Sequence, residues 1–375
     1  MKRILIEIGH PAHVHQFKNM YWELKKQGWE GLFVTKDKEC AIDLLTAYQL
    51  PFKVLGATKQ GIATKILSLP YFAVKMLKIA LGFKPNMFVS RVSPLSGWSS
   101  FLMGKPHITF TDTENVKLMD AISEPFADVV LTSSAYLRDH GKRQIRYPGY
   151  HELAYLHPNR FVPNPYVLKK LGLREGDNYA IVRFVSWTAH HDIGQSGFAY
   201  AQKLSLIRML ESKMKVLISS EAPLNGDLDR LAVRIPPEEM HDLLYYASLF
   251  IGEGATMAEE SAVLGTPAIY INSITGGVIQ DLEGYGLLFR FSNSAMDQEA
   301  AIQKALKIAS DPTIKQECGK QKDRMLSDRI DVTSFIVWFI SEYPQSYKRV
   351  NEKSFSFNRF FGIDKARQAK AERHQ

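Results

Sequence analysis

Cysteine is nearly absent from this 375-residue sequence, which contains only Cys40 and Cys318. The two lie far apart and in no metal-ligand spacing, so neither a disulfide framework nor a zinc cluster is predicted. Long apolar runs are also missing, because no window approaches the roughly 18 residues that a membrane-spanning helix needs. The apolar segment after Lys2 and Arg3 ends at His10 and is too short for a signal-peptide core. A cytoplasmic protein without a membrane span is expected.

The chain is basic, and its excess charge is confined to one half. Residues 1–160 contain 21 Lys and Arg against 13 Asp and Glu, a balance of +8, whereas residues 161–375 contain 26 of each. With 45% hydrophobic and 23% charged residues, the composition is that of a folded protein without low-complexity tracts. A length of 375 residues exceeds what one hydrophobic core usually organises, so two domains are predicted.

Short apolar segments alternate with helical ones along both halves, a pattern typical of parallel sheets covered by helices. The predicted strands are 4–8, 31–35, 52–55, 86–90, 107–111 and 128–132 in the first half and 179–185, 215–219, 231–235, 249–252 and 267–271 in the second. The proline-containing stretch between Tyr150 and Asp177 is interpreted as a linker. We predict an N-terminal domain over 1–155, a C-terminal domain over 156–345 that ends with a helix at 332–341, and a basic tail over 346–375. The tail is expected to be loosely held, apart from anchoring by Phe355, Phe357, Phe360 and Phe361.

The segment from 250 to 271, FIGEGATMAEESAVLGTPAIYI, reads as an apolar strand, a small-residue turn and a helix that ends at Gly265. The free backbone N–H groups of such a helix start, together with the helix dipole, favour a bound diphosphate. We therefore predict a nucleotide-binding site. The positions predicted to hold the diphosphate are Gly254, Ala255, Thr256 and Met257.

Two further features of this segment bear on the same prediction. Glycine at positions 252 and 254 would let a ligand approach the backbone closely. Glu259 or Glu260, in the first turns of the helix, would accept hydrogen bonds from a ribose diol. The structural alternative is that Thr256 caps the helix and the two glutamates complement its dipole.

The loop after the first predicted strand carries three histidines, His10, His13 and His15, and leads into a helix. This loop lies at the carboxyl end of the sheet, where ligands bind in open α/β folds. No carboxylate or cysteine lies nearby in the sequence, so a metal site is not predicted. We predict that His13 faces the cleft between the domains as an acceptor-binding group or general base, with helix capping and packing as the alternative.

Carboxylates follow the strand predicted at 107–111, with Asp112 and Glu114 at its end and Asp120 about two helical turns later. Paired carboxylates there would deprotonate an acceptor hydroxyl or move a proton on a sugar. We therefore predict a catalytic role for these three residues. The structural alternative is capping of the next helix by Asp112 or Thr113.

The run from 62 to 84 is apolar and basic, with helical spacing. An amphipathic helix of this kind can lie on an anionic membrane surface. The basic half of the chain would then face lipid or a phosphate-bearing acceptor. The alternative, which we favour from the sequence, is a buried helix of the N-terminal domain.

The opening run IEIGHPAHVHQFK closely resembles that of a bacterial and archaeal GT-B family catalogued as domain of unknown function 354, and the resemblance extends over nearly the whole chain. The segment 252–271 also resembles the non-hydrolysing UDP-N-acetylglucosamine 2-epimerases of the GT-B superfamily, whose pattern is S-G-G-x-x-E-E, then apolar or small residues, then G-x-P. Gly254-Ala255-Thr256, Glu259-Glu260 and Gly265-Thr266-Pro267 match it here. The resemblance implies a GT-B fold, two Rossmann-like parallel-sheet α/β domains facing each other across a cleft.

The same resemblance implies roles for individual residues. It places ribose binding on Glu260, the second glutamate of the pair, and it aligns the Asp112 region with the epimerases' catalytic glutamate loop. It places contact with the sugar-nucleotide phosphates on His190 or His191, for which a structural hydrogen bond is the alternative. One departure concerns the chemistry: where the epimerases carry a Gly-Asp-Thr turn with a catalytic aspartate, this chain has VSRVSP over 89–94.

Together these features predict a nucleotide-sugar-dependent glycosyltransferase-like enzyme of cell-surface polysaccharide or glycolipid synthesis. The first alternative is a UDP-N-acetylglucosamine 2-epimerase-like isomerase, which the missing aspartate disfavours. The second is a non-catalytic nucleic-acid-binding protein, for which no recognition motif is present. The expected partners are a nucleotide-sugar, preferably a UDP-sugar, and a lipid-linked or saccharide acceptor. Peripheral contact with an anionic inner membrane face is a further expectation, and no cofactor, metal or nucleic acid is expected.

Overall fold

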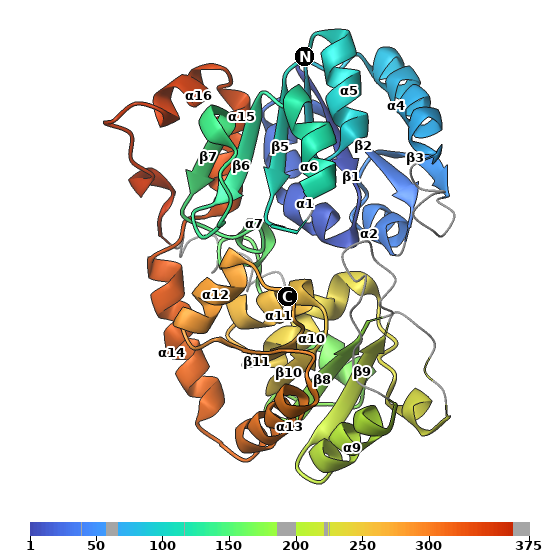
Figure 1. The fold of residues 1–375 in the computed structure, drawn as a ribbon, viewed down its shortest axis with the longest axis vertical. Helices are drawn as coiled ribbons and strands as arrows, with labels where there is room; N and C mark the ends of the chain where they lie inside the picture. Colours follow the sequence, from blue (N-terminus) through green and yellow to red (C-terminus); the bar gives the residue numbers. More distant parts are fainter. Residues whose placement is uncertain are drawn as a thin grey trace. The chain divides into compact units, whose positions relative to one another are not determined.

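The computed structural model describes residues 1–38, 40–57, 67–115, 117–185, 200–220, 224 and 226–362 of the chain (Figure 1). The described residues form two compact units. Unit 1 comprises Met1–Arg160 and Arg329–Gly362, and the described part of unit 2 is Phe161–Asp328. Within the described ranges, no helix is long and apolar enough to cross a membrane.

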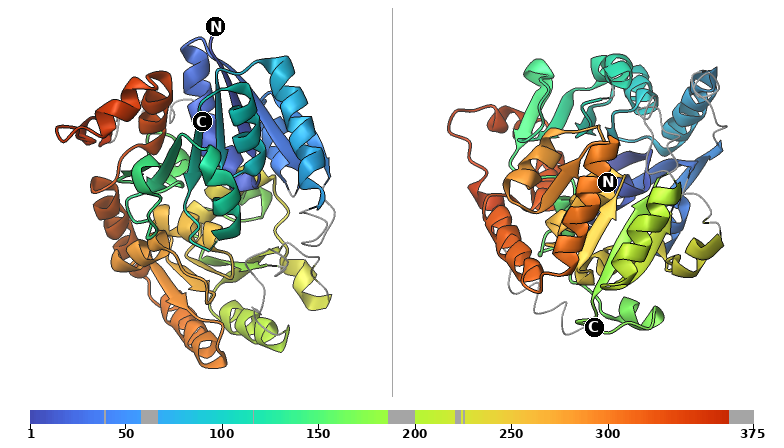
Figure 2. Two further views of the ribbon diagram at one scale, coloured as in Figure 1. Left: turned by 45° about the horizontal axis from the view of Figure 1, so that its top comes forward. Right: turned by 60° about the horizontal axis from the view of Figure 1, so that its bottom comes forward.

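Unit 1 is built on a parallel sheet whose described strands run in the order β3-β2-β1-β4-β5-β6-β7. The strands are β1 (Arg3–Ile8), β2 (Glu30–Asp37), β3 (Phe52–Ala57), β4 (Met87–Arg91), β5 (His107–Thr111), β6 (Val129–Ser133) and β7 (Gln144–Tyr147). The helices are α1 (Pro11–Lys26), α2 (Ala41–Ala47), α4 (Leu69–Phe83), α5 (Pro94–Met103), α6 (Lys117–Ser123), α7 (Leu153–Leu156), α15 (Val332–Ser341) and α16 (Gln345–Val350). Because parallel crossovers are right-handed, α4, α5 and α6 cover one face of the sheet and α1 and α2 the other (Figures 1 and 2).

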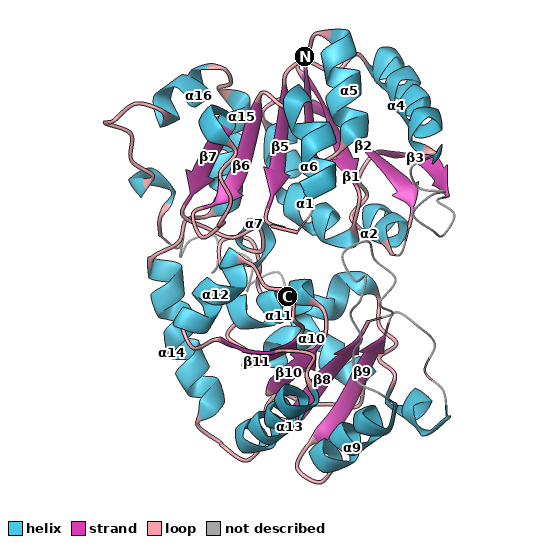
Figure 3. Cartoon of the chain, in the orientation of Figure 1, coloured by secondary structure: helices cyan, strands magenta, loops and turns pink. Residues whose placement is uncertain are grey.

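Unit 2 contains a second parallel sheet, with strand order β12-β11-β10-β8-β9 among the described residues. The strands are β8 (Tyr179–Phe184), β9 (Lys215–Ser220), β10 (Leu249–Gly252), β11 (Ala268–Ile271) and β12 (Leu288–Phe291). The helices are α8 (Tyr166–Lys170), α9 (Tyr200–Glu211), α10 (Met240–Tyr246), α11 (Ala255–Val263), α12 (Gly277–Gly284), α13 (Ala295–Ala309) and α14 (Ile314–Ser327). Helices α9 and α13 pack on one face of the sheet and bury its main apolar core. Figure 3 shows the strands of each unit flanked by helices.

Local sequence explains where two helices of unit 1 begin. Helix α1 starts at Pro11, whose missing N–H has no intrahelical partner at that position in any case. His10 caps this helix by accepting a hydrogen bond from a backbone N–H of the first turn. Helix α5 repeats the arrangement, with Pro94 at its first position and Ser93 as the N-cap. Both helices directly follow a strand, so their capped starts lie at the carboxyl edge of the sheet.

Most strands predicted from the sequence are observed within one or two residues, but three differences stand out. The strand predicted at 231–235 is wrong, because a 3-10 helix ends at Leu231 and only Ala232 forms a β-bridge, with Ile218. Pro236 and Pro237 follow directly, and proline cannot donate to a strand ladder. Strands β7 and β12, which the sequence analysis missed, are four residues each and lie at sheet edges, where the apolar signal is weak.

Residues 329–362 belong to unit 1, in contrast to the predicted domain over 156–345 and to the predicted loose tail from 346, whose residues 363–375 lie outside the described residues. Helices α15 and α16 belong to unit 1, because the apolar side chains of α15 find their partners on α1 and α7, far back in the chain. The predicted aromatic anchoring is observed for Phe355, which stacks on Trp338 at 5.6 Å between ring centroids. Phe360 is buried, whereas Phe361 is exposed.

A buried ion pair fixes this returning segment. Arg160 Nη2 donates to Asp331 Oδ2 at 2.8 Å and Nε donates to Oδ1 at 3.1 Å, and both side chains are buried. Burial alone would raise the pKa of the Asp331 carboxyl, but the charge and hydrogen bonds of Arg160 hold that pKa below its ordinary value. Asp331 also caps α15, and Glu23 of α1 accepts from Arg160 at 3.2 Å. One arginine therefore joins α15 to α1 and to the end of the first segment of unit 1.

We expect Asp331→Asn to lower the free energy of unfolding of unit 1 by about 3 kcal/mol, because it leaves Arg160 buried without its counter-charge. The measurement is urea denaturation followed by tryptophan fluorescence, since four of the five tryptophans lie in unit 1. Glu342→Gln, which removes the exposed ion pair with Arg349 on the same returning segment, is the matched control and should change stability by less than about 1 kcal/mol. Equal effects of the two substitutions would show that the buried pair does not hold the segment.

Candidate functional site

In unit 2 the order in which the chain adds strands to the sheet reverses between the neighbouring parallel strands β8 and β10. The crossover from β8 leads to β9 on one side, whereas the crossovers from β10 and β11 lead to the other side. In open parallel sheets, ligands bind outside the carboxyl ends of the strands at such a reversal, because the two adjacent loops diverge and leave room. The loops at this position are the segment after β8, which begins at Val185, and the junction between β10 and α11.

The start of α11 has the features of an anion site. Its N-cap is Gly254, in an extended conformation and without any side-chain capping hydrogen bond, and its first turn contains no acidic residue. Thr256 lies inside the helix, so the alternative in which Thr256 caps α11 is wrong. By contrast, α13 and α15 are capped by Ser294 and Asp331. Among the described residues, no side chain caps the first N–H groups of α11, so these groups can bind solvent or a ligand.

The two glycines before α11 have different roles. A Cβ at Gly252 would come within 2.8 Å of the Phe250 ring and 2.9 Å of the Arg183 Cβ, so glycine is required there by strand packing and not by a ligand. A Cβ at Gly254 would meet only the Val185 side chain, at 3.3 Å. Strand packing thus explains Gly252, and close approach of a ligand to Gly252 and Gly254 stays a prediction.

A buried carboxylate that the sequence analysis missed braces the junction. Glu253, 1% exposed, accepts a hydrogen bond from the backbone N–H of Val185 at 3.1 Å, which ties the loop after β10 to the loop after β8. Asn272 donates to the Glu253 carbonyl at 3.1 Å and accepts from the N–H of Ile274, which ties in the loop before α12. No local signal marks Glu253, since its partners lie 68 and 19 residues away.

Glu260, to which ribose binding was assigned, lies on the second turn of α11 and is buried. Its Oε1 is 3.0 Å from Nε2 of His241 on α10, which is also buried. Glu259, the other candidate, is partly exposed on the same helix. His190 and His191, the predicted phosphate-contacting residues, lie outside the described residues.

In unit 1 the same kind of reversal lies between β1 and β4. Arg91, the last residue of β4, forms an ion pair with Asp112, the residue after β5, and both side chains are largely buried. Thr113 also donates to Asp112 Oδ1, at 2.9 Å. The turn at 89–94, which departs from the epimerase pattern, thus places the positively charged side chain of Arg91 beside the point where the strand order reverses. The sequence analysis missed Arg91 because its partner is 21 residues away.

Two histidines lie near this ion pair, and both are electrically neutral at pH 7. Nδ1 of His151 is 3.1 Å from Asp112 Oδ2, although neither ring nitrogen of His151 makes a hydrogen bond. Burial, and then the charge of Arg91, lower the pKa values of His13 and His151 well below the ordinary value. His13 accepts a hydrogen bond from the Gly9 N–H on Nδ1 at 3.1 Å, so its proton is on Nε2. In this form Nε2 of His13 carries a proton that it can donate to a hydrogen bond, and it has no lone pair with which to act as a base.

The two other predicted carboxylates differ from Asp112 in their surroundings. Asp120 is 2% exposed and paired with Arg138, so its geometry favours a structural role in holding α6. Burial raises the pKa of the Asp120 carboxyl, and Arg138 opposes that rise. Glu114 is partly exposed, and its Oε1 is 3.4 Å from the backbone N–H of Leu137. Glu114 is thus the more accessible of the two.

A second buried carboxylate anchors the start of α5 beside the reversal. Glu7 of β1 accepts hydrogen bonds from Ser93 Oγ at 2.7 Å and from the Ser96 N–H at 3.1 Å. Burial raises the pKa of the Glu7 carboxyl, and the two serines oppose that rise. This contact fixes the turn that carries Arg91.

The three N-terminal histidines do not come together. His10 caps α1, His13 accepts from Gly9, and Nδ1 of buried His15 lies 3.3 Å from the Tyr48 hydroxyl. Among the described residues, no three His, Cys, Asp or Glu side chains are grouped so as to hold a metal ion.

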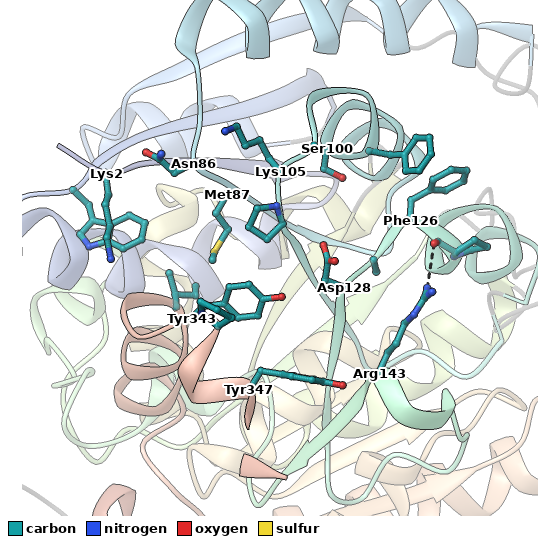
Figure 4. A pocket seen from close by; sticks show the side chains of 18 residues that line it. Lys2, Asn86, Met87, Ser100, Lys105, Phe126, Asp128, Arg143, Tyr343 and Tyr347 are labelled. Carbon is teal, nitrogen blue, oxygen red and sulfur yellow. Dashed lines mark hydrogen bonds between the residues drawn. The ribbon is translucent and has the colours of Figure 1, made fainter. Parts of the chain in front are cut away.

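A pocket of about 1030 Å³ lies elsewhere in unit 1 (Figure 4). Its walls come from the amino ends of the strands and from the returning C-terminal segment, and they include Asn86, Lys105, Asp128 and Tyr343. In parallel sheets the catalytic groups gather at the opposite, carboxyl edge. This pocket is therefore separate from the groups around Arg91 and Asp112.

Solved structures that resemble the chain define its fold class. A Listeria monocytogenes protein assigned as a UDP-N-acetylglucosamine 2-epimerase has a TM-score of 0.67 at 13% identity, covering 95% of this chain and 99% of that protein. S. aureus MnaA, in a co-structure with UDP, has a TM-score of 0.65 at 13% identity, with 95% and 100% covered. The spinosyn forosaminyltransferase SpnP has a TM-score of 0.63 at 12% identity, with 94% and 100% covered. Likeness at these identities concerns the fold alone, and it confirms the GT-B prediction.

The chain belongs to the DUF354 family of proteins of unknown function, whose family model matches residues 2–332. This confirms the family resemblance noted in the sequence. The uncharacterized protein MJ0665 of Methanocaldococcus jannaschii is 24% identical over 282 residues, which cover 71% of this chain and 80% of that protein.

We expect Arg91→Gln to raise the pKa values of His13 and His151, because it removes a nearby positive charge and leaves the Asp112 carboxylate without its counter-charge. The measurement is NMR titration of the imidazole Cε1 protons. His107 is the internal control, since burial lowers its pKa to about 4 without a contribution from Arg91, and its titration should not move. Unchanged titration of His13 and His151 would contradict the placement of Arg91 beside them.

Proposed function

We propose that the protein is a nucleotide-sugar-dependent glycosyltransferase-like enzyme of cell-surface polysaccharide or glycolipid synthesis, with a UDP-sugar as its donor. The observation that carries the proposal is the start of α11. A helix N-terminus with Gly254 as its N-cap, beside the reversal of strand order, presents N–H groups that no side chain in the described part of the chain caps. A diphosphate accepts hydrogen bonds from such groups, and the helix dipole stabilises its negative charge.

The bound UDP of S. aureus MnaA and the transferase activity named for SpnP support this choice among the possible anions. As a diphosphate leaves the sugar, its negative charge grows, and fixed N–H groups stabilise that charge without reorganising. This stabilisation requires no metal ion. Glu260, held by His241, is proposed to bind the ribose of the donor, and His190 or His191 to contact its phosphates.

The acceptor side of the reaction is assigned to unit 1. We propose Asp112 as the base that takes the proton from the acceptor hydroxyl, because its position at the carboxyl end of β5 suits a catalytic group. His13, protonated on Nε2, donates a hydrogen bond to the acceptor, and Arg91 orients the Asp112 carboxylate. The proposed acceptor is a saccharide or a lipid-linked saccharide, and the latter would bring the enzyme into peripheral contact with an anionic membrane.

The second candidate is isomerisation of the nucleotide-sugar, which the fold likeness to the Listeria epimerase-like protein favours. In this case Glu114, the more accessible carboxylate after β5, would move the proton on the sugar. Transfer is preferred because the turn that carries a catalytic aspartate in the epimerases contains Arg91 here, and because Asp120 is buried in an ion pair.

We expect Thr256→Glu to weaken UDP binding by at least about tenfold, measured by isothermal titration calorimetry. The new carboxylate occupies the place of the diphosphate and repels it. Helix stability should be retained, since an acidic residue in the first turn complements the helix dipole. Ala295→Glu, which adds the same charge to the exposed first turn of α13, is the matched control and should bind UDP as the natural protein does. Equal binding by both variants would remove α11 as the diphosphate site.

When the protein is incubated with UDP-sugars in the absence of an acceptor, we expect no epimer at sugar C2 in NMR spectra of the products. Transfer needs an acceptor oxygen, so the donor should persist or be slowly hydrolysed. A C2 epimer that accumulates with the natural protein and not with Glu114→Gln would establish the isomerase instead.

A further inference from the structure

Helix α4 is apolar on two opposite faces. One face, made of Phe72, Met76 and Ala80, is buried against the sheet of unit 1. These residues recur every four positions, as expected of a helix packed by one stripe. The sequence favoured a buried helix in the run at 62–84, but only one face of α4 is buried. Residues 62–66 of that run lie outside the described residues.

The other face of α4 carries large apolar side chains into solvent. Tyr71, Val74 and Leu81 are 58%, 54% and 54% exposed, and Leu67, just before the helix, is 80% exposed. At 100° per residue these side chains lie about opposite the buried stripe. Lys78 is exposed between Val74 and Leu81. With it, the exposed positions 67, 71, 74, 78 and 81 are alternately four and three residues apart. A regular apolar stripe that no other described part of the chain covers is typical of a surface that contacts a partner.

Helix α5 extends this apolar surface. It packs against α4, and Leu102 near its end is 68% exposed, whereas Phe101 lies against Phe126 with 5.4 Å between ring centroids. Both helices lead into strands of one parallel sheet, so they run in the same direction and end at the same sheet edge (Figure 1). We call Leu67, Tyr71, Val74, Leu81 and Leu102 the α4–α5 surface.

The sequence segment that carries this surface has charge of one sign. From residue 44 to residue 111 the sequence contains eight Lys and Arg and no Asp or Glu, so this segment alone carries a charge equal to the net +8 of the chain. Lys84 and Lys105, at the ends of the two helices, are exposed together with Lys78. Lysines of this kind keep their charge in the polar layer while their alkyl stems lie along apolar surface. The partner must therefore accept apolar side chains and carry negative charge.

We propose that the α4–α5 surface docks unit 1 onto a membrane that contains anionic lipid. Apolar side chains on one helix face enter the boundary of the acyl chains, while the surrounding lysines bind lipid phosphates. A second copy of the chain fits less well, because a two-fold contact would place these lysines against each other. The proposal extends the proposed function by giving the enzyme a route to a lipid-linked acceptor, but its observations do not depend on the nucleotide site.

The experiment is co-sedimentation of the full chain with vesicles. We expect binding to vesicles of phosphatidylglycerol mixed with phosphatidylcholine, and weak binding to phosphatidylcholine alone. The combined substitution Tyr71→Ser, Val74→Ser and Leu81→Ser should weaken binding to the mixed vesicles by at least about tenfold. The matched control is Tyr166→Ser with Met296→Ser, two exposed apolar residues of unit 2 that should leave vesicle binding unchanged.

Three results would overturn the proposal: no binding of the natural protein to the mixed vesicles, equal binding by the triple variant, or a dimer that the triple substitution dissociates in sedimentation velocity. UDP binding measured on the same samples separates this proposal from the proposed function. The triple variant should keep its UDP affinity, because its changes lie in unit 1. If the natural protein binds vesicles but not UDP, the membrane contact stands and the proposed function fails.

Discussion

The reversal of strand order in each parallel sheet is the constraint on which the functional assignment depends. It occurs between β1 and β4 in unit 1 and between β8 and β10 in unit 2. At these points neighbouring crossovers leave for opposite faces, so the loops separate and backbone groups become accessible. Gly254 at the start of α11, and Arg91 with Asp112 after β4 and β5, lie beside these reversals. Fold and site are therefore consequences of one topology.

Buried carboxylates with assigned partners hold this topology in place. Glu7 fixes the start of α5, Glu253 joins the loops after β8 and β10, and Asp331 anchors the returning C-terminal segment. A buried charge is costly unless it is paired, so each of these contacts restricts the backbone strongly around it. Because the loops are fixed in this way, the groups proposed to bind ligands need little rearrangement before they do so.

The distribution of charge separates the two proposed roles of the molecule. Unit 2, which is proposed to bind the donor, uses helix N–H groups to stabilise negative charge at one point. Unit 1 combines a strongly basic segment with the exposed apolar stripe of α4. A helix buried on one face and apolar on the other is expected where a protein meets an apolar phase, and the surrounding lysines favour an anionic one.

The sequence alone determined the two parallel sheets, the GT-B class and the helix start near residue 255, because strand periodicity, glycine turns and family motifs are local signals. It missed the short edge strands β7 and β12 and the return of α15 to unit 1. Only the tertiary structure decided which polar groups are already engaged. Asp120 was predicted to be catalytic, yet it forms an ion pair with Arg138, 18 residues further along the chain. Asp112 likewise pairs with Arg91, 21 residues before it, and no motif marks this arginine. Such pairs form through packing between elements distant in the chain, and no local pattern encodes them.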